Sequence, residues 1–220
     1  HFYVFFEKGI ASHIFAQNCF VHDLNNFTPI PLGIENRHWG HLNSPRTSIT
    51  NFDKFRQQIN HNQDNSVYLS FTIHTNKQER IACLRNALNL RNLFIGGLQS
   101  WRQQENKSLN PLIDQLDHYR NIQRHKFILC PWGMGLDTHR FWESLYLGSI
   151  PITRNHLVYN IHNLKTIILL DDWSQLSQFD QLISTSDIVV NPESRKHDNS
   201  ILEFNYWRKY IYSIINSKTN

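Results

Sequence analysis

From about residue 66 onward, short apolar runs alternate with amphipathic segments. The apolar runs, which are typical of strands, are Val67–Phe71, Leu93–Ile95, Phe127–Cys130, Ile150–Ile152 and Thr166–Leu170. The segments with apolar residues at helical spacing are 75–89 (with Thr75 as a candidate cap), 112–122, 137–148, 175–184 and 201–216. This alternation favours a parallel sheet, and strands of Val, Ile and Leu indicate burial on both sheet faces. The sequence therefore predicts an α/β fold: a Rossmann-like parallel sheet with helices on both faces.

The residues before this alternation follow a different pattern. The Pro29–Gly33 cluster interrupts any long helix or strand, and a short helix is expected only at residues 51–60. We therefore divide the chain into a partial N-terminal segment with a linker, residues 1–65, and a Rossmann-like domain, residues 66–220.

Charge and composition exclude several classes of protein. The chain has 220 residues, of which 40% are apolar, so a sizeable core is expected. Its net charge is +4, from 22 basic and 18 acidic residues that are scattered along the chain. A nucleic-acid-binding protein more often has a dense basic stripe, so no nucleic-acid partner is expected. No apolar run approaches the ~20 residues of a membrane-spanning helix, so no integral membrane segment is expected.

The cysteines and the chain start bear on the compartment. The three cysteines are far apart and form no cluster with histidine, which argues against a zinc site and against a disulfide scaffold. No signal peptide is visible. The chain begins at His1 and its single methionine is Met134, so we expect it to be processed, trimmed or cut from a longer protein. A reducing compartment, the cytoplasm, is the expected location.

Residues 125–155 carry the clearest chemical pattern. An apolar strand ends in Pro131-Trp132-Gly133, and Gly133 and Gly135 allow the backbone to approach a ligand closely. Asp137 and Thr138 are both good caps for the helix that follows. The whole unit stands at the carboxyl end of an expected parallel strand, where open α/β sheets bind their ligands.

The start of this helix is a candidate anion site. Its first backbone N–H groups are free to bind an anion, and Arg140 adds a fixed charge suited to phosphate. Glu143 follows three residues later on the same helix face and is suited to accept hydroxyl groups. The alternative is an ordinary strand–turn–helix unit in which Arg140 and Glu143 form a surface ion pair.

The string G-x-G-x-D-T-H-R-F-W-E-S-L-x-L-G-S-I-P-I, residues 133–152, resembles the signature of exostosin-like glycosyltransferases and their short bacterial and viral relatives. Residues 14–36 and 70–80 resemble further parts of the short relatives. The resemblance implies a GT-B arrangement, in which two Rossmann-like domains face a cleft and the C-terminal one binds the nucleotide-sugar. In this chain it implies a donor-binding domain with a truncated N-terminal part. Trp132 departs from the family pattern, which often has a small residue there.

The resemblance also implies roles for individual residues. Arg140 and Glu143 would be catalytic, Arg140 at the diphosphate and Glu143 at ribose or sugar hydroxyls. The residues that would bind the rest of the donor are Thr75, Asn76, Arg80, Gly133, Gly135, Asp137, Thr138 and His139. Arg80 and the helix start at Asp137–His139 would hold the diphosphate, with Thr75 and Asn76 approaching it.

The expected activity is therefore transfer of a hexosyl or pentosyl group from a nucleotide-diphosphate sugar to a glycan or another hydroxyl acceptor. No metal site and no cofactor beyond the donor are expected, because a metal is not needed if protein groups hold the diphosphate, and no Asp-x-Asp motif is present. A general base is not assigned; Glu35, His22 and Asp23 are weak candidates. The short relatives are cytoplasmic, whereas a eukaryotic family member would work in the Golgi.

Two other functions compete with this one. The chain could be a non-catalytic Rossmann-like module that binds a nucleotide-sugar without turnover. It could also be a single-stranded nucleic-acid binder that stacks bases on Trp101, Trp132 and Tyr119, although the scattered charge argues against this.

Overall fold

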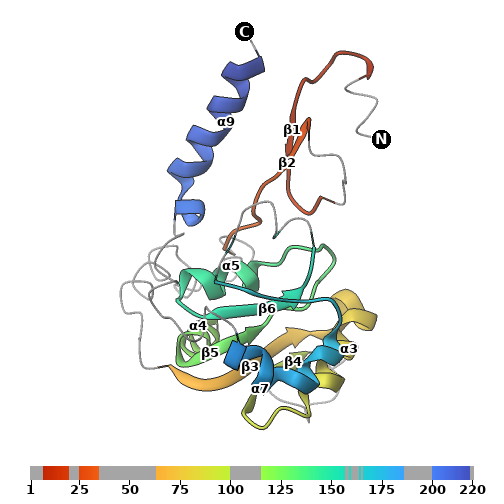
Figure 1. The fold of residues 1–220 in the computed structure, drawn as a ribbon, viewed down its shortest axis with the longest axis vertical. Helices are drawn as coiled ribbons and strands as arrows, with labels where there is room; N and C mark the ends of the chain where they lie inside the picture. The colour runs from red at the N-terminus through yellow and green to blue at the C-terminus, as the bar shows by residue number, and fades with distance from the viewer. Residues whose placement is uncertain are drawn as a thin grey trace, which may run out of the picture.

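A five-stranded parallel sheet forms the centre of the protein (Figure 1). The structure is a computed structural model that describes residues 7–19, 25–34, 63–99, 115–156, 159, 164, 166–185 and 200–218. The strands of the sheet are β3 (Asp64–Thr72), β4 (Leu93–Gln99), β5 (His125–Leu129), β6 (Ile150–Arg154) and β7 (Ile168–Leu170). Their order is β4-β3-β5-β6-β7, and every pairing is parallel.

Helices alternate with the strands from β3 to β6, as the sequence predicts. Among the described residues, α3 (Lys77–Ala87), α4 (Gln115–Arg124) and α5 (His139–Tyr146) connect successive strands, and α7 (Phe179–Thr185) and α9 (Phe204–Lys218) follow β7. The 3-10 turns are η3 (Ile73–Asn76), η5 (Trp173–Gln178) and η7 (Ser200–Leu202). The predicted α/β class and the Rossmann-like parallel sheet are confirmed.

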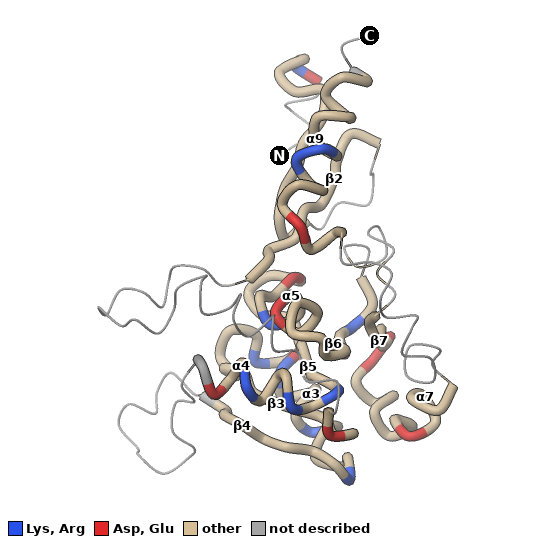
Figure 2. Tube along the Cα trace, turned by 90° about the vertical axis from the view of Figure 1, so that its left-hand side faces the viewer, with Lys and Arg blue, Asp and Glu red and all other residues tan. Residues whose placement is uncertain are grey.

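The two N-terminal strands are not part of this sheet. Strands β1 (Ile14–Ala16) and β2 (Phe27–Pro29) form a separate two-stranded parallel pair. In both ribbon and tube views this pair and α9 project from the same end of the molecule (Figures 1 and 2). The helix expected at residues 51–60 lies outside the described residues, as do Glu35, His22, Asp23 and Trp101.

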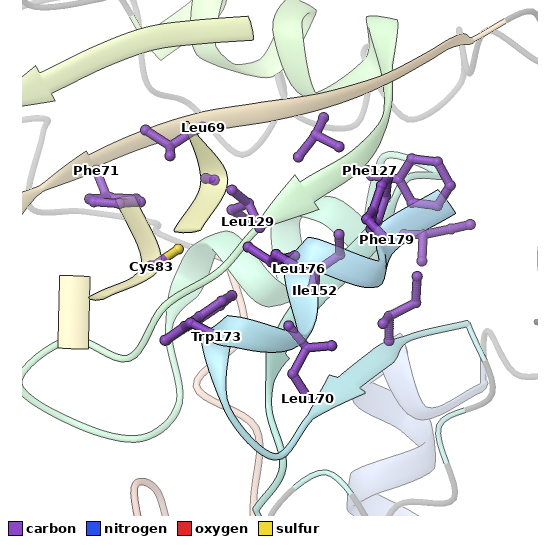
Figure 3. Packing of buried hydrophobic residues seen from close by; sticks show 14 residues of the cluster. Leu69, Phe71, Cys83, Phe127, Leu129, Ile152, Leu170, Trp173, Leu176 and Phe179 are labelled. Carbon is purple, nitrogen blue, oxygen red and sulfur yellow. The ribbon is translucent and has the colours of Figure 1, made fainter. Parts of the chain in front are cut away.

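Both faces of the sheet are covered, because its central strands are apolar on both sides. Val67, Leu69 and Phe71 of β3 point to one face, where they pack with α3, η5 and α7 (Figure 3). Tyr68 points to the other face, where it packs with α4, α5 and η7. Val67, Tyr68 and Leu69 are each at most 1% exposed, so the prediction of helices on both faces is confirmed.

The strand order contains one reversal. From β3 the chain moves outward to β4 on one side, then returns past β3 to β5 and continues through β6 to β7 on the other side. The helices that follow β3 and β5 consequently lie on opposite faces, α3 on one and α5 on the other. In open α/β sheets, ligands bind at the carboxyl ends of the strands where the order reverses. In this sheet that point lies between β3 and β5.

Two of the predicted helices differ clearly from the structure, one at its start and one in its continuity. The expectation that Thr75 caps the first one is wrong, because the chain leaves β3 through the tight turn η3 and the helix begins later. Asn76 is the N-cap, and its side-chain oxygen accepts from the backbone N–H of Glu79 at 3.4 Å. The predicted helix 175–184 is split into η5 and α7, and Asp172 caps η5 through a capping box.

Gly148 ends α5 in the left-handed region of backbone conformation, with φ of +84°. Replacing it with Ala should lower the free energy of unfolding by about 1–2 kcal/mol, because a Cβ atom disfavours this conformation. Asn tolerates the conformation better, so Gly148→Asn should lose less. Urea unfolding of the three proteins measures the difference, and equal midpoints for Gly148→Ala and the wild type would contradict the prediction.

Candidate functional site

The segments that follow β3 and β5 meet at the reversal point of the sheet and carry most of the expected binding residues. After β3 the chain runs through η3 into α3 and includes Thr75, Asn76 and Arg80. After β5, residues 130–138 lead to α5 and include Gly133. The carboxyl ends of two adjacent parallel strands thus present these side chains at one sheet edge.

Arg80 joins the two segments. Its Nε donates to the backbone oxygen of Trp132 at 2.9 Å, and its Nη1 donates to that of Thr72 at 2.5 Å. A Cβ atom on Gly133 would lie 3.0 Å from Nη2 of Arg80, so a glycine leaves room for the guanidinium here. Arg80 is only 7% exposed. Among the described side chains, no carboxylate forms an ion pair with it.

Thr75 and Asn76 bond to the same strand ends as Arg80. Thr75 Oγ1 donates to the backbone oxygen of Thr72 at 3.0 Å, and Asn76 Nδ2 donates to that of Gly133 at 3.1 Å. Thr138 is also close, since its Cγ2 lies 3.8 Å from the place of a Cβ on Gly133. The structure therefore brings Thr75, Asn76, Gly133 and Thr138 together around the guanidinium of Arg80.

Arg140 adds a second positive charge to this place. It is the second residue of α5 and is partly exposed. Burial, and then the charge of Arg140, lower the pKa of Arg80 to about 10, so the two guanidinium groups repel each other across the edge. Among the described residues, the buried Nε of Arg140 has no acceptor, and no carboxylate forms an ion pair with this side chain. Neither arginine thus has a carboxylate partner in an ion pair within the described part of the chain.

Asp137 makes its contacts within the chain. It is 3% exposed, and its carboxylate accepts from the backbone N–H groups of Leu32 at 2.7 Å and Thr138 at 2.9 Å. The indole N–H of Trp142 lies 2.7 Å from each of its oxygens. Burial raises the pKa of Asp137 to about 6, while these hydrogen bonds act in the opposite direction. Its carboxylate links the N-terminal segment to α5.

Gly135 and His139 also contact the N-terminal segments. A Cβ atom on Gly135 would lie 2.2 Å from Oδ1 of Asn18, an oxygen that accepts from the backbone N–H of Asp137 at 2.7 Å. His139 Nδ1 donates to the backbone oxygen of Gly33 at 2.7 Å. The absence of a side chain at Gly135 thus admits Asn18 of the same chain.

Glu143 lies one turn after Arg140 and is 5% exposed. The hydroxyl of Tyr119 donates to its Oε1 at 3.4 Å, and Nε2 of His118 is 3.9 Å from its Oε2. The other ring nitrogen of His118 bonds to the hydroxyl of Tyr68 at 3.0 Å. Burial, and then the charge of Arg140, lower the pKa of His118 to about 3, so this imidazole is neutral at neutral pH. Glu143 therefore lies deeper than a surface partner of Arg140 would.

Sequence reasoning missed Glu79 and Arg154 at the same edge. Arg154, the last residue of β6, pairs with Glu79 at 3.0 Å, and its guanidinium carbon lies 4.7 Å from the centre of the Trp132 ring. The second oxygen of Glu79 accepts from the indole N–H of Trp173 at 2.9 Å. The available signals were an arginine at the carboxyl end of a buried strand and a glutamate directly before Arg80.

Several other kinds of site do not occur in the described part of the chain. No group of three or more His, Cys, Asp and Glu side chains in it is arranged to hold a metal ion. None of its helices has the length and apolar character needed to cross a membrane. All three cysteines are free and buried: Cys19, Cys83 and Cys130.

Neither a scan against protein-family models nor a search among curated proteins gave a match for this chain. The fold is Rossmann-like in general, with a five-stranded parallel sheet. The site is a cationic edge formed by Arg80 and Arg140, with the charge of Arg154 balanced by Glu79.

The contact between Gly135 and Asn18 can be tested with a double-mutant cycle. Gly135→Ala should lower the free energy of unfolding by about 1–3 kcal/mol, because the new Cβ displaces the Asn18 side chain. Asn18→Gly removes that side chain and suits its positive φ of 52°. In the Asn18→Gly background, Gly135→Ala should lower the free energy of unfolding by about 1 kcal/mol or less. If the effects of the two substitutions on this free energy were additive, the contact would be contradicted.

The lowered pKa of His118 predicts acid sensitivity. The pKa is about 3 in the folded chain and close to its ordinary value of 6.5 in the unfolded chain. Below pH 6.5 the unfolded chain binds the proton first, so stability is complete above that pH and falls by about 1.4 kcal/mol per pH unit below it. When the pH falls from 7 to 5, the free energy of unfolding of His118→Gln should therefore decrease by about 2 kcal/mol less than that of the wild type. Urea unfolding at both pH values measures this, and equal losses in the two proteins would contradict the assignment.

Proposed function

We propose that this chain is the donor-binding domain of a GT-B type glycosyltransferase, which transfers a sugar from a nucleotide-diphosphate sugar to a hydroxyl group of a glycan or another acceptor. The observation that carries the proposal is the pair Arg80 and Arg140. They are two cations close enough for one to lower the pKa of the other, without a carboxylate partner among the described residues. They lie at the reversal point of the strand order, where such sheets bind ligands.

A diphosphate is the ligand that fits this pair best. Two guanidinium groups without an ion-pair partner among the described residues favour a ligand with at least two negative charges, and their planar donors match phosphate oxygens. The start of α5 adds the positive end of a helix dipole. Arg140 stands in the first turn of that helix, so the side-chain charge and the helix dipole act on the same anion.

The reaction needs stabilisation of a leaving group. The bond between the anomeric carbon and the diphosphate oxygen breaks, while the acceptor oxygen bonds to that carbon and gives up its proton. Negative charge therefore develops on the diphosphate, next to Arg80 and Arg140, where it is stabilised most. We propose that these groups do the work for which other transferases use a divalent cation. Glu143 is the proposed acceptor of ribose or sugar hydroxyls.

The resemblance of residues 133–152 to the exostosin-like signature supports the same proposal. Within that string, Asp137 and His139 use their side chains to hold the N-terminal segment. In this proposal they act by positioning the start of α5, and Arg80 and Arg140 make the charged contacts.

Nucleotide binding tests the proposal. We expect UDP or GDP to bind the wild type, measured by calorimetry in a magnesium-free buffer, and Arg140→Ala to bind the same nucleotide about 10- to 100-fold more weakly, because a charge-assisted contact to phosphate is lost. Arg120→Ala is the matched control, since Arg120 is 64% exposed and pairs with Asp117 on α4. It removes the same charge and should bind like the wild type.

Two outcomes would change the proposal. Equal losses in Arg140→Ala and Arg120→Ala would mean that only net charge attracts the nucleotide, and no binding by the folded wild type would refute the donor site. Release of sugar from the matching UDP- or GDP-sugar separates the transferase from the alternative, a non-catalytic module that binds the donor without turnover.

A further inference from the structure

A second group of unused donors lies beside the arginine pair, at the carboxyl ends of β5 and β6. The indole Nε1 of Trp132 and the Nε of Arg154 are both buried, and neither has an acceptor among the described residues. A buried N–H without an acceptor costs roughly 1–3 kcal/mol. Two such groups on side chains in contact are the feature expected where a ligand oxygen completes the site.

Contacts on two sides hold the Trp132 ring in place. The guanidinium carbon of Arg154 lies 4.7 Å from the ring centre, and the ring of His156 meets it edge-on at 5.9 Å. Arg154 is itself fixed by its ion pair with Glu79 at 3.0 Å. The two unused donors therefore belong to ordered side chains, which lowers the entropy lost when a ligand binds.

The charge at this second group differs from that of the arginine pair. The positive charge of Arg154 is balanced by Glu79, which is 7% exposed and whose other oxygen accepts from Trp173. Trp132 is uncharged. Because the group is neutral as a whole, it favours an uncharged oxygen, such as a hydroxyl or carbonyl, over a further phosphate or carboxylate.

Trp132 connects the two groups. The carbonyl of Trp132 accepts from the Nε of Arg80 at 2.9 Å, so one residue presents its carbonyl to the diphosphate side and its indole to Arg154. We propose that Trp132 and Arg154 form a second subsite that binds an uncharged oxygen of the same ligand, next to the diphosphate. The oxygen belongs to a sugar hydroxyl or to a carbonyl of the base, and the inference rests on the proposed function.

Trp132→Phe tests the subsite because it keeps an aromatic ring under Arg154 and removes only the indole N–H and part of the ring. The probes are inorganic pyrophosphate, UDP, GDP, UDP-glucose and GDP-mannose, each titrated by calorimetry. We expect Trp132→Phe to bind pyrophosphate like the wild type and to bind at least one nucleotide or nucleotide-sugar about 5- to 10-fold more weakly. Equal losses for the nucleotide and its sugar form assign the oxygen to the nucleoside, that is, to the base or the ribose, and a loss for the sugar form alone assigns it to the transferred sugar.

Two further variants separate this subsite from general effects. Arg154→Lys keeps a charge beside Glu79 but lacks the Nε donor, so it should weaken the same probe as Trp132→Phe. Trp207→Phe is the control, because the indole N–H of Trp207, on α9, already donates to the backbone oxygen of Ile201 at 2.7 Å. It should bind every probe like the wild type.

Three results would overturn the subsite. Trp132→Phe could bind all probes like the wild type while Arg140→Ala does not, which would leave the proposed function standing alone. Trp132→Phe could weaken pyrophosphate as much as the nucleotides, which would mean that it deforms the diphosphate site. A wild type that binds none of the probes would overturn the subsite together with the proposed function.

Discussion

The site depends on one buried cation that bonds to neutral oxygens. The guanidinium of Arg80 donates to the backbone oxygens of Thr72 and Trp132. Thr72 is the last residue of β3, and Trp132 lies just after the end of the adjacent strand β5. These bonds join the ends of β3 and β5, and a Cβ atom on Gly133 would lie 3.0 Å from the same guanidinium. Carbonyl groups orient the cation without cancelling its charge, and its pKa of about 10 leaves it charged at neutral pH. An anion at this edge therefore has a more favourable electrostatic interaction energy than it would have beside an arginine that is paired with a carboxylate.

Arg154 shows the contrast on the next strand. It pairs with a buried carboxylate, Glu79, and so contributes little net field at the edge. Arg80 and Arg140 have no such partner in the described part of the chain. At neighbouring strand ends of one sheet, Arg80 and Arg140 thus form a site with two positive charges, and the Arg154–Glu79 pair forms a neutral one. A ligand with a charged part next to an uncharged polar part matches this division.

The sequence predicts the sheet well because local patterns determine it. Apolar runs such as Val67–Phe71 are buried on both faces. The family resemblance implies that Asn76 and Arg80 lie near the loop of Gly133, and the structure brings these residues together. The expectation for Thr75 failed because a tight turn precedes α3. Periodicity carries no information about such turns.

The long-range contacts of the motif could not be predicted in this way. The residues that bind Gly135, Asp137 and His139 are Asn18, Leu32 and Gly33, which lie more than 100 positions earlier in irregular segments. Arg154 and Glu79 are likewise brought together by the order of strands and helices. A spacing rule applied to one stretch of sequence cannot identify partners that only the fold supplies.

The loop from Gly133 to His139 contacts two different parts of the chain, α3 and the N-terminal segment. At Gly133 it contacts Arg80, and two residues later, at Gly135, it contacts Asn18. The carboxylate of Asp137 then holds Leu32 of the N-terminal segment and Trp142 of α5 together. Because α5 carries the guanidinium of Arg140, the place of that charge is set by hydrogen bonds to a segment far away in the sequence. The N-terminal segment is therefore part of the structural support of the proposed anion site. Asp137 and His139 anchor this segment, whereas Arg140 has the proposed binding role.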